Sequence, residues 1–264
     1  MTKVALLFYG LKPLSCLKKA TPFLKKDITI DKWKNNVIQP NNCDVFIHCW
    51  SPEYQEECLE NYKPKKFLFE EKKQFPSRRQ KIFDYGDTLD TINRSHLYSM
   101  KTVLELKNKY EQENHFTYDV VMIARMDIMW FNKINIKDID VKEKIYISPW
   151  NYAFDKTQTR PDHLKAPYDA WFISNSQDIN CFIDLYDKID EYINHSNSHW
   201  IKYFYFVDMG IQDKIDYMFY RFHDFVMLRW LFMPQGLLCL NGQIGDEWRG
   251  WIEKREEHLQ SLSL

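Results

Sequence analysis

Glycine is scarce in this sequence. Seven of the 264 residues are glycine, and no two of them form a Gly-x-Gly pair. A loop that cradles a phosphate with its backbone amides needs several closely spaced glycines, because the ligand must approach the main chain. The composition therefore argues against a glycine-rich phosphate loop.

An excess of one charge and a long apolar segment are also missing. The 36 basic residues are balanced by 37 acidic ones, which gives a formal net charge of −1. This balance provides no general attraction to nucleic acid or to an anionic membrane, so no nucleic-acid partner is expected. No uninterrupted apolar stretch approaches the roughly 18 to 20 residues that cross a bilayer, so no transmembrane segment is expected.

Cysteine motifs and a secretory signal are lacking as well. The six cysteines form no Cys-x-x-Cys pair and no cluster with histidine at zinc-ligand spacing. The apolar run at residues 4–9 is too short for the apolar region of a signal peptide. We therefore expect reduced thiols and a cytoplasmic location, with attachment to the inner face of a membrane as the alternative.

Short apolar runs alternate with helical patterns over much of the chain. Strands alternating with helices predict an α/β fold with a mostly parallel sheet that is covered on both faces. We expect a single domain, with an α/β core over 1–195 and a helical extension over 196–264. Polar loops are expected at 72–94 and 149–168. The expected strands are 4–9, 44–50, 66–70, 118–130, 144–148 and 169–174, and the expected helices are 31–38, 53–62, 95–114 and 177–193.

The segment 118–131, YDVVMIARMDIMWF, holds two opposite charges within an apolar run. In a strand, residues two apart point to the same face, so Arg125 and Asp127 are expected side by side. Ligands of open α/β sheets bind at the carboxyl ends of the strands, where a carboxylate can coordinate a divalent cation and a guanidinium can hold a phosphate. The alternative is a partly buried salt bridge without chemistry. Desolvation offsets much of the attraction in such a pair, and this favours a site.

This segment, placed after the expected helix at 95–114, resembles the YD-x-V-I-x-x-R-x-D-x-x-F segment of bacterial and viral glycosyltransferases. These enzymes have the A-type (GT-A) fold and build capsule, lipopolysaccharide and other surface glycans. Three more segments resemble the family in matching order: VALLFYG at 4–10, DVFIHCWSP at 44–52 and DAWFISNSQDINCFIDLY at 169–186. The resemblance covers roughly residues 3–190. It implies a Rossmann-like GT-A fold and the transfer of a sugar from a nucleoside-diphosphate sugar to a hydroxyl acceptor.

The resemblance also implies roles in the reaction. Arg125 stands at the first position of the family's Asp-x-Asp metal motif, and Asp127 is the carboxylate left to hold Mn²⁺ or Mg²⁺ with the diphosphate. His223 is the candidate for a C-terminal metal ligand. Arg125 would neutralise part of the charge that develops on the departing diphosphate. In an inverting reaction, Asp169 would be the base that deprotonates the acceptor hydroxyl.

Other residues are candidates for binding the donor and the acceptor. Gly10 would let the backbone approach a nucleotide, and the resemblance implies that the turn Tyr9–Leu11 borders a uridine or guanosine ring. Trp50 could stack on the base and His48 could bond the base or ribose, with structural packing as the alternative for both. The remaining candidates are Glu70, Ser95 and Ser99 for the nucleotide, and Trp150 and Trp171 as an apolar platform for the acceptor sugar.

The expected partners are a sugar-nucleotide donor and a glycan or lipid-linked acceptor. The basic, aromatic segment 219–233 has core packing as its default role and contact with the membrane surface as the alternative. Two other functions stay open. One is a sugar-phosphate nucleotidyltransferase, against which the missing glycine-rich loop counts. The other is a non-catalytic glycan- or nucleotide-binding scaffold on a degenerate transferase fold, which the loss of the first Asp of the motif favours.

Overall fold

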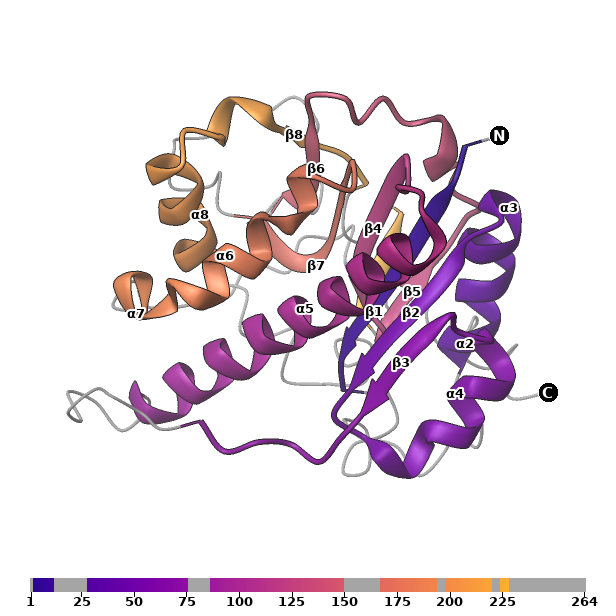
Figure 1. Cartoon of the computed structure of the whole chain (residues 1–264), viewed down its shortest axis with the longest axis horizontal. Helices are drawn as coiled ribbons and strands as arrows, with labels where there is room; N and C mark the ends of the chain where they lie inside the picture. Colours follow the sequence, from indigo (N-terminus) through magenta and orange to yellow (C-terminus); the bar gives the residue numbers. More distant parts are fainter. Residues whose placement is uncertain are drawn as a thin grey trace, which may run out of the picture.

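A seven-stranded, mostly parallel sheet forms the centre of the protein (Figure 1). The computed structural model describes residues 2–11, 28–75, 86–149, 167–193, 198–219 and 224–227. Strand β7 pairs antiparallel with both of its neighbours, and the other pairings within this sheet are parallel. In order across the sheet, the strands are β3 (Lys66–Phe69), β2 (Asp44–Cys49), β1 (Val4–Gly10), β4 (Val120–Arg125), β7 (Pro167–Ser174), β6 (Ile145–Pro149) and β8 (Ile215–Tyr217).

Helices cover both faces of the sheet, because strands β1, β2 and β4 are apolar on both sides. One face packs against α2 (Ile28–Trp33), a π-helical turn (Lys34–Ile38) and α4 (Gln55–Tyr62). The other face packs against α5 (Gly86–Asn114), α6 (Cys181–Asp187), α7 (Ile189–Tyr192) and α8 (Ser198–Asp208). Figure 1 shows α5 running across this second face. The predicted α/β fold is confirmed, and it is compatible with a Rossmann-like arrangement.

The strand order reverses between β1 and β4. The chain runs from β1 through β2 to β3 at one edge, and α5 then carries it back to β4 on the other side of β1. In open α/β sheets such a reversal is the topological switch point, where neighbouring loops diverge and leave room for a ligand. The fold therefore draws attention to the carboxyl ends of β1 and β4.

The strand expected over 118–130 is broken, which corrects the prediction. Strand β4 ends at Arg125, Met126 and Asp127 form a turn, and β5 (Ile128–Trp130) pairs with β9 (Phe225–Met227) in a separate two-stranded sheet. Strands β4 and β5 and the turn between them are largely buried, so the apolar run in the sequence is continuous even though the chain changes direction. Hydrophobicity alone could not show this break.

The long helix begins earlier than expected. Helix α5 starts at Gly86, so residues 86–94 are helical and Ser95 lies inside the helix rather than at its N-cap. The polar residues that suggested a loop are buried and paired: Arg94 contacts Asp90 at 3.0 Å and also pairs with Asp190 of α7. Because these buried residues are polar, the hydrophobic periodicity of the sequence does not reveal this part of the helix.

Two further helical predictions are corrected. The helix expected at 31–38 includes Ile28–Trp33 and continues through α3 (Gln39–Asn41), with Pro40 tolerated in the first turn of α3. The region after residue 195 is not helical throughout: α8 is followed by a 3₁₀ turn (Gln212–Lys214) and by strands β8 and β9. Other short 3₁₀ helices of the described residues are Pro52–Tyr54, Ile136–Asp138 and Asp178–Asn180. No helix in the described ranges is both long and apolar enough to cross a membrane.

Candidate functional site

Three parallel strands bring candidate residues to one level at their carboxyl ends. Tyr9 of β1 pairs in register with His48 of β2 on one side and with Arg125 of β4 on the other. Residues in register on neighbouring parallel strands point to the same face. Tyr9 packs in the cluster that contains α5, so all three side chains lie on the α5 face, beside the switch point.

Arg125 and Asp127 form a closed, two-pronged ion pair. Arg125 Nε donates to Oδ1 of Asp127 at 2.8 Å, and Nη2 donates to Oδ2 at 2.7 Å. The predicted proximity of the two charges is therefore confirmed. Asp127 is 1% exposed, whereas the Arg125 side chain is 17% exposed. Burial would lower the pKa of Arg125, but the neighbouring carboxylate outweighs it and raises that pKa further above its ordinary value.

The arrangement does not fit a divalent-cation site. Both carboxylate oxygens of Asp127 already accept hydrogen bonds from Arg125. Within the part of the chain that the structure describes, no three His, Cys, Asp or Glu side chains come together as metal ligands. A cation at Asp127 would have to displace the guanidinium and bring its remaining ligands from elsewhere. His223, the second predicted ligand, lies outside the described residues, as does Trp150.

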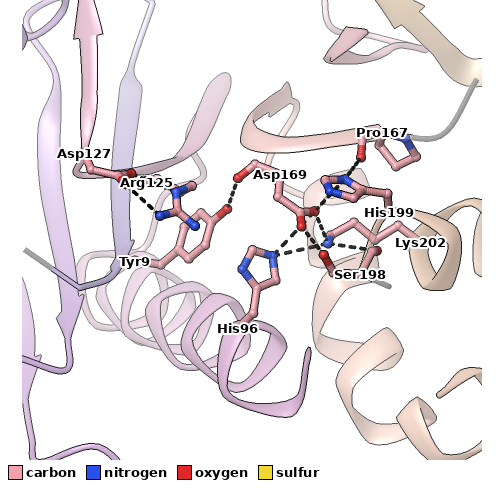
Figure 2. Close-up of polar contacts among 9 residues, drawn as sticks. All are labelled: Tyr9, His96, Arg125, Asp127, Pro167, Asp169, Ser198, His199 and Lys202. Atoms are coloured by element: carbon pink, nitrogen blue, oxygen red, sulfur yellow. Dashed lines mark hydrogen bonds and ion pairs between the residues drawn. The ribbon is translucent and has the colours of Figure 1, made fainter. Parts of the chain in front are cut away.

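A second cluster of charged side chains surrounds Asp169 on β7 (Figure 2). Lys202 and Ser198 of α8 donate to its two carboxylate oxygens, Lys202 to Oδ1 and Ser198 to Oδ2. His199 Nδ1 lies 3.6 Å and His96 Nε2 lies 3.7 Å from Oδ1. The hydroxyl of Tyr9 donates to the main-chain oxygen of Asp169 at 2.9 Å, which links this cluster to the end of β1.

Burial and mutual charge set the protonation states of this cluster. Burial would raise the pKa of Asp169, but His199, Lys202 and His96 hold it well below its ordinary value. Burial lowers the pKa of Lys202, and Asp169 opposes this shift. Burial, with Lys202 next, holds the pKa of His96 well below its usual range. Asp169 is therefore a stable carboxylate with low proton affinity, and His96 is neutral.

A hydrogen-bonded chain holds the turn after β1. The amide of Gly10 donates to Ser99 Oγ at 2.9 Å, and Ser99 lies 2.6 Å from Nδ1 of His48. Nε2 of His48 lies 3.1 Å from Oε1 of Glu70. The consistent assignment is a neutral His48 that donates to Glu70 through Nε2 and accepts from the Ser99 hydroxyl through Nδ1. Gly10 has a φ of +99°, which residues with a side chain rarely adopt.

These contacts change the roles expected for several residues. Both ring nitrogens of His48 and the hydroxyl of Ser99 are engaged in holding the Gly10 turn, so neither is placed to bond a base or ribose. Glu70 also pairs with Lys73 at 3.0 Å. Trp50 is buried, stacks on Tyr98 at 5.4 Å between ring centroids and meets His48 edge-to-face at 4.7 Å, so it offers no exposed ring to a base.

The other candidates divide between surface and core. Leu11 follows the turn and is exposed, as a residue bordering a ligand should be. Ser95 is buried within α5 and marks no helix terminus that could hold a phosphate. Trp171 is fully buried among Trp130, Phe219 and Phe225, on the face of the sheet away from α5, and offers no exposed ring to an acceptor sugar.

Two surface cavities lie away from this edge of the sheet. A cavity of about 640 Å³ is lined by residues at the end of α5, among them Glu111 and Phe116. Another of about 540 Å³ is lined by residues near the amino ends of β1 and β4, among them Thr2 and Asp119. Neither contains a candidate residue. The carboxyl edge of the sheet is the candidate site because of the register of its strands and its buried charges.

Sequence reasoning missed the residues around Asp169. His96, Ser198, His199 and Lys202 come from α5 and α8, and Lys202 and His96 are 106 positions apart. One signal was present: Lys202 falls on the same helical stripe as Ile201, Tyr205 and Phe206, all of which are buried. A lysine on an apolar stripe indicates a buried charge that needs a partner.

Comparison with known proteins assigns no family to the chain. No protein-family model matches it, and no curated protein shows significant similarity to it.

Proposed function

We propose that this protein is a glycosyltransferase that moves a sugar from a nucleoside-diphosphate sugar to a hydroxyl group of a glycan or lipid-linked acceptor. The observation that carries the proposal is the in-register pair of Tyr9 and Arg125 at the switch point between β1 and β4. Nucleotides bind at such points in open α/β sheets. The proposed reaction, sugar transfer, rests on the resemblance to GT-A enzymes of segments 4–10, 44–52, 118–131 and 169–186.

In this proposal the diphosphate lies against Arg125 and the base lies beside the turn at Gly10 and Leu11. A guanidinium has five N–H donors, and Asp127 accepts two of them. Three donors remain without an acceptor among the described residues, which suits the forked recognition of phosphate oxygens. Arg125 would thus stabilise the charge on the departing nucleoside diphosphate.

Asp169 is the acceptor-side carboxylate of the proposal. Its low pKa keeps it ionised but makes it a weak proton acceptor, since Lys202 and Ser198 already bond its oxygens. The acceptor hydroxyl would have to displace Ser198 from Oδ2 before Asp169 could take its proton. No catalytic step is assigned to a divalent cation, because Asp127 is closed by Arg125 in the described arrangement.

The proposal is tested by turnover. Purified protein is incubated with a panel of UDP-, GDP- and other nucleoside-diphosphate sugars, with and without Mn²⁺ and with candidate glycan acceptors, and released nucleoside diphosphate is measured. We expect release from at least one donor, and a loss of at least tenfold in the Arg125→Lys variant, which keeps the charge but loses the fork. Arg94→Lys is the matched control, because Arg94 is also a buried arginine paired with carboxylates. Release from no donor under any of these conditions contradicts the proposal.

A second candidate function is a nucleotide-binding protein without transfer. The closed Arg125–Asp127 pair favours it, because the carboxylate expected to hold a metal is already occupied. This candidate predicts that UDP or GDP binds the protein while no sugar nucleotide is turned over.

A further inference from the structure

Lys202 uses all three of its N–H donors within the cluster around Asp169. Its Nζ is fully buried and donates to Oδ1 of Asp169, to the main-chain oxygen of Ser198 at 3.2 Å and to Nε2 of His96 at 3.2 Å. An ammonium group has no lone pair, so it cannot accept a hydrogen bond. Nε2 of His96 must therefore be the acceptor in the contact with Lys202.

This contact fixes the tautomer of His96. A neutral imidazole that accepts through one nitrogen carries its proton on the other, so the hydrogen of His96 is on Nδ1. The doubly protonated form is disfavoured because Nε2 faces Lys202, and because Arg125 also lies close enough to lower the pKa of His96. Asp169 does not reverse the assignment, since its Oδ1 is 3.7 Å from Nε2, beyond hydrogen-bond distance.

The Nδ1–H group of His96 has no hydrogen-bond acceptor among the residues that the structure describes. The side chain is only 10% exposed. Figure 2 shows Nδ1 pointing away from Lys202, toward the side where Tyr9 and Arg125 lie. The Tyr9 hydroxyl donates to Asp169, and the Tyr9 ring meets His96 edge-to-face at 5.1 Å, a contact much weaker than a hydrogen bond. Nδ1 is not among the fully buried unpaired polar atoms of the described residues, so it is open to water and to a ligand oxygen. Its direction toward Arg125 makes it a donor for an anion bound on that side.

We propose that His96 is a ligand-binding residue that donates its Nδ1–H to an oxygen of a bound diphosphate, on the side shared with Arg125. Arg125 holds three N–H donors beyond those that Asp127 accepts, so the two side chains form a donor set for an anion. Lys202 is a positioning residue in this arrangement, because it aims the proton of His96. The inference rests on the proposed nucleotide site and adds the residue that would bind its diphosphate.

Two substitutions separate binding from structure. An asparagine amide occupies roughly the place of Nδ1 of histidine, and a glutamine amide roughly that of Nε2. His96→Asn therefore keeps a donor toward the ligand, whereas His96→Gln keeps a partner for Lys202 and loses that donor. Inorganic pyrophosphate is the probe, because it retains the diphosphate without base or sugar.

We expect calorimetry to show that pyrophosphate binds the wild type, that His96→Gln weakens binding about tenfold (about 1.4 kcal/mol) and that His96→Asn recovers most of the loss. Nitrogen-15 NMR of the wild type should show the Nδ1–H tautomer of His96, and Lys202→Met should change it. Equal affinity in wild type and His96→Gln, an Nε2–H tautomer, or no pyrophosphate binding overturns the inference. If pyrophosphate binding depends on His96 but the protein turns over no sugar nucleotide, the transferase proposal is contradicted and the role of His96 in binding stands.

Discussion

Arg125 closes on Asp127 with two hydrogen bonds, from Nε to Oδ1 and from Nη2 to Oδ2, at the turn that separates β4 from β5. The pair stands next to the end of β1, so one interaction both fixes the turn and presents a cation at the switch point. The contribution of this ion pair to the stability of the fold can be measured separately from its contribution to ligand binding.

Asp127→Ala should destabilise the fold. The substitution leaves the mostly buried guanidinium of Arg125 without its counter-ion, which costs about 3 kcal/mol when a buried pair is broken. Urea unfolding should show the lower midpoint. The double variant Arg125→Met/Asp127→Leu should recover much of the loss, because no unpaired charge remains. A midpoint unchanged by Asp127→Ala would show that the ion pair contributes nothing.

Lys107 and Lys202 are both fully buried, and their substitution should have similar effects on stability but different effects on ligand binding. Lys107 pairs with Glu111 at 3.1 Å and with Ser176, far from the carboxyl edge, whereas Lys202 pairs with Asp169 and His96. Lys107→Met and Lys202→Met should each cost about 2 to 4 kcal/mol in urea unfolding. Affinity for UDP or GDP, measured by calorimetry, should fall only in Lys202→Met. Equal effects of both variants on affinity would remove the cluster around Asp169 from the binding site.

The turn at Gly10 should depend on its backbone angle and on Ser99. Gly10→Ala should destabilise the protein by about 1 to 2 kcal/mol, because a φ of +99° is strained for alanine although nothing lies within 4 Å of the added methyl group. Ser99→Ala should cost about 1 to 3 kcal/mol, since it leaves Nδ1 of the buried His48 without its hydrogen-bond donor. Thermal or urea unfolding measures both. No loss of stability in either variant would mean that this series of hydrogen bonds does not hold the turn.

Stability should fall as the pH drops below about 6.5. The folded-state pKa values of His48 and His96 are lowered, chiefly by burial, so the unfolded chain takes up protons in this range while the folded protein does not. Each histidine contributes a slope of up to about 1.4 kcal/mol per pH unit. Asp169 adds nothing here, because its stabilisation is lost only below its unfolded pKa of about 3.9.

Urea midpoints between pH 7.5 and pH 5.5 measure this slope. His96→Gln should flatten it, since glutamine does not titrate. A slope that is the same in wild type and variant would mean that His96 is protonated in the folded protein, contrary to its contact with Lys202.

The sequence predicted the parts of the fold whose signals are local. Strands β1 and β2 are apolar runs that end near Gly10 and Pro52, and their positions were predicted to within one residue. The break after Arg125 was missed, because the turn at Met126 and Asp127 is as buried as the strands around it. The start of α5 was missed, because Arg94 and Asp90 are buried polar residues whose pairing satisfies them.

The candidate site was predictable only along the strands. Tyr9, His48 and Arg125 could be placed at one edge because parallel strands share their direction. The contacts of His96 and Lys202 depend on how α5 and α8 pack against β7, which no local pattern encodes. The engagement of His48 by Ser99 and Glu70 is non-local in the same way.

Calorimetric titration with UDP and with GDP tests the central claim, a nucleotide site at the switch point held by Arg125. The account predicts that at least one of the two binds the wild type and Arg94→Lys with equal affinity, and binds Arg125→Lys at least tenfold more weakly. Failure of both nucleotides to bind the wild type, or equal affinity in Arg125→Lys, would contradict it.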